Sequence, residues 1–166
     1  MSETITFARL PAGIAELKAL PEASLENPNG VAALVVAALS AYPTDKNAAI
    51  EMLNFLRGPR PLSNYDIQFL ADRFRGKDYV IRSYFNGSSP QNNYTPAQPY
   101  SVTVFENPYS RDAFGEGYIT LYINSTGADS PRQVKLRLKP SEGRWYLWEQ
   151  YLLPDIRKPV ALDEWA

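Results

Sequence analysis

Apolar and polar residues alternate in three runs within the last third of the chain, between Gly117 and Glu149. Alternation with a period of two is typical of a strand that buries one face and exposes the other. Two groups of turn-forming residues separate the three runs. We therefore predict an antiparallel meander of three strands, at about 118–124, 133–139 and 144–151.

Two more strands are predicted before the meander, at 79–85 and 100–106. In the second of these, Val102 and Val104 alternate with small polar residues. A polar loop separates the two strands, and another loop leads into the meander. The sheet is therefore expected to hold about five strands, most of them antiparallel.

The first half of the chain carries helical patterns instead. A short helix is predicted at 11–20, and an amphipathic helix at 46–57 has apolar residues at helical spacing. A further helix begins after Ser63, where Asp66 occupies the third helical position of a capping box. Gly76 is expected to end it.

The most apolar predicted helix lies at 29–41. Asn27 is a good N-cap, and Pro28 suits the first helical position because its missing N–H would have no partner there. The helix is apolar on nearly every side, and such a helix belongs in the interior of a protein.

Helices followed by strands predict an α+β fold. We expect a single domain, 1–166, in which about four helices at 11–75 pack on a sheet at 78–151. An extended tail at 152–166 follows, and Trp165 is expected to anchor it. The composition, 45% hydrophobic and 21% charged, is that of a globular protein.

The charge balance argues against general nucleic-acid binding. The chain has 17 basic and 18 acidic residues and a net charge of −1, whereas a nucleic-acid binder needs a positive patch that displaces counterions. The longest apolar run, 31–39, is much shorter than the ~20 residues that span a bilayer. The N-terminus has no signal-peptide pattern. We expect a soluble, cytoplasmic protein that does not bind membranes.

Histidine and cysteine are both absent. This excludes histidine-dependent triads, histidine or thiolate metal sites, cysteine nucleophiles and disulfides. The acidic residues show no spacing of a metal loop or of a glycosidase pair. We therefore predict no metal site, no cofactor and no catalytic residue, although carboxylates, lysines and tyrosines can also transfer protons.

The loop that contains Asp129 and Arg132 is the first candidate binding element. In one interpretation the two residues are a charged pair that reaches for a ligand or partner from a rigid scaffold. In the other, Asp129 bonds backbone amides in a turn shaped by Pro131, and Arg132 pairs with Asp129 or with a carbonyl. The sequence alone leaves both open.

Aromatic residues gather on the predicted meander. On its last strand, Trp145 shares a face with Leu147, and Tyr146 shares the other face with Trp148. One face is core, and the other is either a binding surface or covered by helices or a partner. We take Tyr122 and Trp148 as candidate binding residues.

Basic residues line one predicted strand face, at Lys135, Arg137 and Lys139. Next to aromatic rings they would suit a stacking platform for single-stranded nucleic acid, and a plain solvated face is the alternative. The basic segment 57–60 follows a predicted helix end, where cations are favourable, and carries no functional prediction.

Tyr94 lies in the polar loop between the first two predicted strands. A long loop of this kind is either a lid or recognition element or a surface excursion held by asparagine turns and prolines. Tyr94 completes the set of candidate binding residues.

Several segments of the chain resemble an uncharacterised bacterial family, a domain of unknown function. These segments are NFLRGPRPLSNYD at 54–66, NNYTP at 92–96, ENPYS at 106–110, STGADSPR at 125–132, WYLWE at 145–149 and IRKP at 156–159. The resemblance covers about residues 20 to 166. It implies no activity and no catalytic residue.

The order of elements is also similar to the α+β folds of the nuclear-transport-factor-2 and cystatin types. This resemblance implies a cone-shaped sheet. Such folds include enzymes, binding proteins and oligomerisation modules, so the resemblance does not choose among functions.

Three functions follow as hypotheses. The first is a non-enzymatic module that binds an unidentified protein partner or self-associates through its sheet face and loops. The second is a small-molecule binder or carboxylate-dependent enzyme with a pocket inside a cone-shaped sheet. The third is single-stranded nucleic-acid binding.

Overall fold

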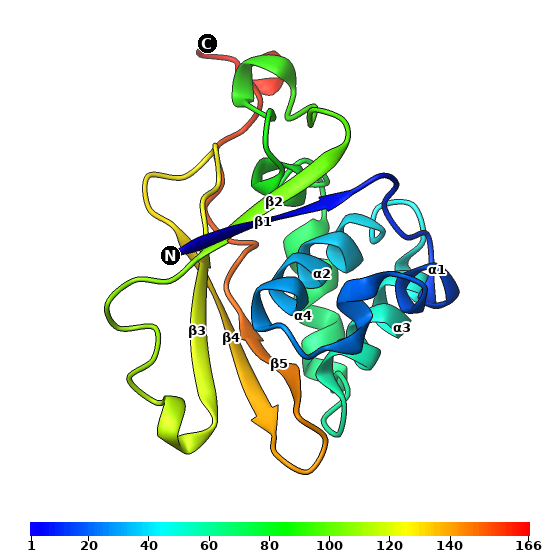
Figure 1. The fold of residues 1–166 in the computed structure, drawn as a ribbon. Helices are drawn as coiled ribbons and strands as arrows, with labels where there is room; N and C mark the ends of the chain where they lie inside the picture. The colour runs from blue at the N-terminus through cyan, green and yellow to red at the C-terminus, as the bar shows by residue number, and fades with distance from the viewer.

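The computed structural model describes residues 1–166 and has an α+β fold of four helices and one antiparallel sheet (Figure 1). The strands are β1 (Ser2–Phe7), β2 (Tyr100–Phe105), β3 (Tyr118–Ile123), β4 (Arg132–Lys139) and β5 (Arg144–Gln150). The helices are α1 (Ile14–Lys18), α2 (Pro28–Ser40), α3 (Lys46–Arg57) and α4 (Asn64–Phe74). The sheet is an open meander in the order β1-β2-β3-β4-β5, so β1 and β5 are its edges.

The helix starts follow the sequence signals. The Asn27 side chain accepts a hydrogen bond from the backbone N–H of Asn29 at the start of α2. At the start of α4, Ser63 and Asp66 form both bonds of the predicted capping box. Satisfying these free N–H groups fixes where each helix begins. The helix expected at 11–20 is shorter in the structure and comprises only α1, Ile14–Lys18.

The prediction of a strand at 79–85 is wrong. That segment forms a short 3₁₀ turn, Ile81–Tyr84, in which the Ser83 hydroxyl donates to the carbonyl of Val80 at 2.7 Å. Consecutive apolar side chains of this segment are buried. A short continuous apolar run is also typical of a buried strand, which is why the sequence pattern misled the prediction. The fifth strand is instead β1, and the helices therefore do not open the chain.

β1 pairs with β2 along its whole length, from Ser2 opposite Phe105 to Phe7 opposite Tyr100. Only Ile5 and Phe7 are buried on this strand. Two apolar residues are too few for a period of two to be recognised, so the sequence pattern does not predict this strand.

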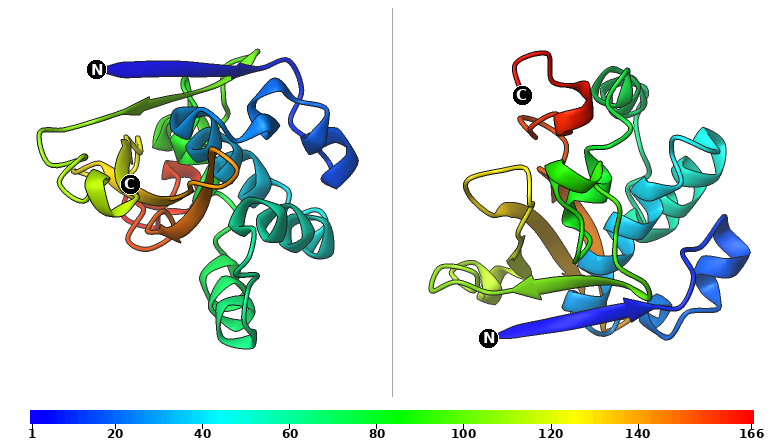
Figure 2. Two further views of the ribbon diagram at one scale, coloured as in Figure 1. Left: turned by 60° about the horizontal axis from the view of Figure 1, so that its bottom comes forward. Right: turned by 90° about the horizontal axis from the view of Figure 1, so that it is seen from above.

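The core is organised around α2, which lies across the inner face of the sheet and contacts all five strands (Figure 2). Every residue from Gly30 to Leu39 is buried. This confirms the interior position predicted from an apolar surface on all sides. The side chains of α2 fill the space that a ligand pocket inside the sheet would need.

The tail is held by residues other than the predicted one. Leu152, Leu153 and Ile156 are buried, whereas Trp165 is 94% exposed and anchors nothing. Burial of three aliphatic side chains close to β5 holds the chain there; Pro159 is buried as well, and residues 160–166 are exposed.

None of the helices combines the length and the apolar character that crossing a bilayer requires.

Candidate functional site

The outer face of the sheet, opposite α2, carries aromatic and basic side chains. The register places Arg137 of β4 beside Tyr118 of β3 on one side and Tyr146 of β5 on the other. Trp145 and Leu147 share one face of β5, as predicted, and this face points into the core, while Tyr146 and Trp148 are half-buried on the outer face.

Trp148, on the edge strand β5, is the shared contact of several of these side chains. The guanidinium carbon of Arg60 is 3.9 Å from the centroid of its ring, and that of Arg137 is 4.8 Å away. The ring of Tyr118 meets the indole edge-on at 5.6 Å, and the Lys135 ammonium lies 4.8 Å from the Tyr118 centroid. We call these five residues the cation–aromatic cluster. Cation–π attraction holds its positive groups in place.

Arg60 reaches the sheet from the turn between α3 and α4. Its guanidinium donates a hydrogen bond to the carbonyl of Trp148 and lies 3.9 Å from the Glu149 carboxylate. Gly58 allows this turn, because its φ is +63° and a side chain there would overlap the ring of Tyr146. The turn thus fastens the end of α3 to β5.

Arg57 stands behind Arg60 and is only 7% exposed. Its Nε donates to the carbonyl of Arg60 at 2.9 Å, and its Nη2 lies 3.7 Å from the Asp66 carboxylate. Burial lowers the pKa of Arg57, and the nearby charge of Arg60 lowers it further. A guanidinium remains protonated in proteins nevertheless, so Arg57 is a buried positive charge.

A basic cleft of about 340 Å³ opens beside these residues. Its lining includes four cations and no carboxylate; the cations are Arg57, Arg60, Arg137 and Lys139. Pro59, Tyr146 and Trp148 form much of the remaining wall. The cleft is therefore suited to negatively charged groups.

Besides Glu149 and Asp66, a third carboxylate close to the basic cleft, Glu142, is already engaged. Glu142 accepts hydrogen bonds from the Tyr146 hydroxyl at 2.7 Å and from the Lys139 ammonium at 2.9 Å. These two bonds lower the pKa of Glu142. Burial, and then the bond to Glu142, raise the pKa of Tyr146. Tyr146 therefore remains a hydroxyl donor and is a poor general base.

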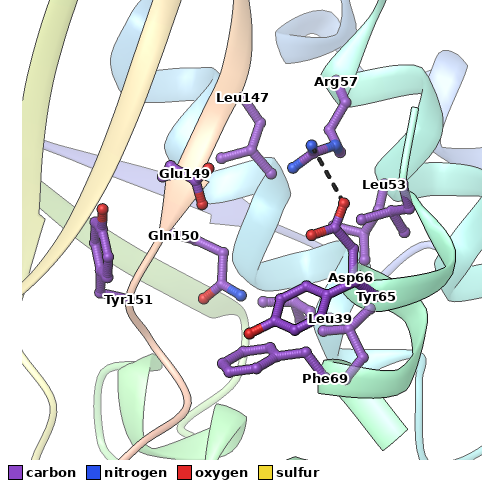
Figure 3. Close-up of a pocket in the computed structure, with 12 residues that line it drawn as sticks. Leu39, Leu53, Arg57, Tyr65, Asp66, Phe69, Leu147, Glu149, Gln150 and Tyr151 are labelled. Atoms are coloured by element: carbon purple, nitrogen blue, oxygen red, sulfur yellow. Dashed lines mark ion pairs between the residues drawn. The ribbon is translucent and has the colours of Figure 1, made fainter. Parts of the chain in front are cut away.

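A second hollow, the apolar pocket, lies between α3, α4 and β5 (Figure 3). Its volume is about 250 Å³, and eight of its twelve lining residues are hydrophobic. Asp66 and Glu149 supply negative charge on its wall. Burial opposes ionisation of Asp66, but the hydrogen bonds from Ser63 and the charge of Arg57 outweigh it and lower the pKa of Asp66.

The structure does not pair Asp129 with Arg132. Asp129 accepts a hydrogen bond from Arg157 at 2.8 Å. The Nη2 of Arg132 donates to the carbonyl of Asp155 at 3.2 Å and to that of Pro154 at 3.5 Å. Both side chains thus fasten the tail to the 125–132 segment, which agrees with the carbonyl-bonding interpretation of Arg132.

Tyr94 is fully buried. Its hydroxyl donates to the carbonyl of Arg157 at 2.7 Å, and its ring stacks on Tyr79 with the centroids 5.8 Å apart. Asn92 holds the loop: its side chain accepts from the N–H of Ser89 at 2.9 Å and from that of Thr95 at 3.0 Å. The loop is thus a packed turn, with its tyrosine turned inward.

Of the candidate binding residues, Tyr122 and Trp148 lie on the outer face and only Trp148 belongs to the cation–aromatic cluster. Tyr122 packs against Phe105 instead, with ring centroids 5.9 Å apart. Sequence reasoning missed Arg57 and Arg60. The signal for them was the Gly58-Pro59 turn that separates the two arginines, which brings both side chains to β5.

The comparisons identify a family and no activity. No curated protein and no solved structure is significantly similar to this chain, so the likeness to nuclear-transport-factor-2 and cystatin folds gains no support. The model of one family, described as a domain of unknown function (DUF6935), matches residues 9–160. The predicted resemblance to an uncharacterised family is confirmed, and the chain belongs to the family DUF6935.

Proposed function

We propose that the protein is a non-enzymatic interaction module that binds an acidic segment of a partner protein on its outer sheet face. The observation that carries this proposal is the arrangement of Arg60 and Arg137 around Trp148, next to a cleft lined by four cations and no carboxylate. Arg57, Arg60 and Lys139 already lie near carboxylates of the protein, whereas Arg137 has no such partner. A carboxylate of the partner would therefore pair with Arg137 first.

The cluster favours binding because its cations are already ordered. Arg60 is held by the indole face, by the Trp148 carbonyl and by its position next to Arg57. A guanidinium that is fixed before binding loses little conformational entropy when a carboxylate arrives. Its planar fork can also donate two parallel hydrogen bonds to one carboxylate.

The chemistry of the basic cleft supports binding better than catalysis. Its arginines stay protonated and cannot accept a proton, and the phenol of Tyr146 is held as a donor by Glu142. None of these groups is poised to transfer a proton near neutral pH.

A nucleobase platform has less support. Stacking on Trp148 would need the indole surface that Arg60 already covers at 3.9 Å. Displacing Arg60 would also break its bond to the β5 backbone.

The test uses a fluorescently labelled hexaglutamate peptide and measures its anisotropy at low salt. We expect saturable binding that weakens as salt screens the charges. Arg137→Ala is expected to weaken binding about tenfold, the effect of losing one charged hydrogen bond. Arg75→Ala is the matched control, because Arg75 is exposed at the end of α4 and pairs with Asp72.

Equal losses in the two variants, or no binding of the peptide at low salt, would refute the proposal. Tighter binding of a single-stranded oligonucleotide with the same number of charges would favour the nucleic-acid hypothesis instead. Light scattering of the free protein tests self-association. If the protein is a dimer and the peptide dissociates it, this face is a self-association surface.

A further inference from the structure

The apolar pocket and the basic cleft adjoin each other. Arg57 and Leu147 line both hollows. Arg60 crosses between them, from the turn after α3 to the backbone of β5. A single extended segment that lies over this crossing would therefore contact both hollows.

The apolar pocket leaves large apolar side chains uncovered. Tyr65 at its rim is 78% exposed, and Phe69 next to it is half-buried. The cause is the position of α4, which buries only Leu70 and Phe74 and stands away from the rest of the molecule (Figure 2). Figure 3 shows Tyr65 and Phe69 close together on the α4 side of the pocket, with Gln150 pointing toward them from β5, while the ring of Tyr151 lies beyond β5.

Charge distinguishes the two hollows. The charged residues on the wall of the basic cleft are all cations, whereas the apolar pocket carries Asp66 and Glu149 against a single cation, Arg57. An acidic side chain is thus attracted to the first hollow and repelled from the second. This difference fixes which part of a ligand occupies which hollow, since like charges placed together disfavour the wrong arrangement.

We propose that the partner segment has two parts, a bulky apolar side chain seated in the apolar pocket and acidic residues in the basic cleft. This inference rests on the function proposed above and names the partner's chemistry. The apolar side chain supplies affinity by burying area against Tyr65 and Phe69. The acidic residues supply orientation and a fast encounter.

The test compares labelled peptides that contain four glutamates and one further residue, either phenylalanine or alanine. The further residue is placed at the N-terminal end in one pair of peptides and at the C-terminal end in another. We expect phenylalanine to improve binding about tenfold over alanine in at least one pair, the effect of burying most of a large apolar side chain.

Variants of the pocket wall assign that gain to the pocket. The double variant Tyr65→Ala, Phe69→Ala is expected to abolish the preference for phenylalanine while the alanine peptides bind as before. Tyr109→Ala is the control, because Tyr109 is 71% exposed in the loop that precedes β3. Thermal unfolding of each variant establishes that it is folded.

The outcomes separate the two proposals. If the alanine peptides bind but phenylalanine gives no gain in either position, the two-part ligand is wrong and the acidic-segment proposal stands. If the gain persists in the double variant, the apolar side chain binds elsewhere and the inference is overturned. If no glutamate peptide binds, both proposals fail.

Discussion

Arg60 illustrates how a single residue gains a role through three simultaneous contacts. Its guanidinium stacks on Trp148, donates to the carbonyl of the same residue and lies near Glu149. Each contact alone is worth little at a surface. Together they fix the orientation of a charge that would otherwise be mobile, which is the requirement for selective binding of an anion.

The ion pair between Glu106 and Arg111 should make the stability of the protein depend on pH. Glu106 accepts hydrogen bonds from Arg111 at 2.7 and 3.1 Å, and these bonds lower its pKa in the folded protein. A carboxylate with a lowered folded pKa stabilises the protein above its unfolded pKa of about 4.3, and this contribution is lost as the pH falls through the folded pKa. In Glu106→Gln, that part of the acid destabilisation should disappear.

Urea unfolding of the wild type and of Glu106→Gln at pH 7, 5 and 3 measures the effect. The gap between their free energies of unfolding should be largest at pH 7 and shrink toward pH 3. Arg111→Met, which removes the donor, should reduce the pH dependence in the same way. A gap that stays constant across this range would show that the ion pair does not set the pKa.

Individual side-chain roles are only partly predictable from the sequence. The spacing of Trp148 from Tyr146 predicts that the two share a face, but not that this face is the outer one. The role of Arg60 is not predictable from the sequence. A cation just after a helix end is favourable there for local reasons, and the residue that Arg60 contacts on β5 is 88 positions away in the sequence. Asp129 and Arg132 are neighbours in the sequence, yet both bond to the tail, which no local pattern reveals.

At the scale of elements, the turn after α3 decides where the arginines lie. Gly58 has a φ of +63°, and its missing side chain leaves room for the ring of Tyr146. The turn therefore needs glycine for two reasons, backbone conformation and close packing. Gly76, after α4, has a φ of +69°, but a methyl group added there would meet no other part of the protein within 4 Å.

Gly58→Ala and Gly76→Ala therefore form a matched pair. Gly76→Ala adds backbone strain alone and should lower the free energy of unfolding by about 1 kcal/mol. Gly58→Ala adds a clash with Tyr146 and should cost on the order of 3 kcal/mol. It should also weaken hexaglutamate binding, because Arg57 and Arg60 move with the turn. Chemical denaturation measures the two costs, and equal costs would contradict the packing argument.

The elements that the sequence predicts well are those with local signals at their ends. Caps and prolines locate α2, α3 and α4 within a few residues, and strong alternation locates β3, β4 and β5. The prediction of a strand at 79–85 fails because the apolar residues of this segment are buried in and around a 3₁₀ turn. Burial from several sides comes from tertiary packing and leaves no period in the sequence.

On the scale of the whole molecule, the core is built around α2, which is enclosed on all sides. The sheet contacts it along one side, and α3 and the 3₁₀ turns Pro21–Ser24 and Ile81–Tyr84 contact it elsewhere, so that no side of Gly30–Leu39 reaches solvent. The all-apolar pattern predicts this interior position, but not the strand at the N-terminus that completes the sheet. One cluster of 38 buried residues results.

Substitutions in α2 should therefore be costly on every face. Ala33→Met places a larger side chain at a fully buried position and should destabilise the protein by about 1–3 kcal/mol through overpacking. Ala15→Met on α1 is the control, because Ala15 is exposed and should change the stability by less than about 0.5 kcal/mol. Urea unfolding compares the two, and a tolerant Ala33 would mean that α2 has free space beside it.

The pairing of β1 with β2 has a consequence for how the protein assembles during synthesis. Thr4 lies opposite Thr103, and all four helices are made in the interval between these two strands. The first strand must wait for a partner that the ribosome completes much later, while Ile5 and Phe7 remain uncovered. Closing so long an interval is entropically unfavourable and slow. We expect the N-terminal strand to join last, after the helices and the C-terminal hairpins have formed the surface on which it docks.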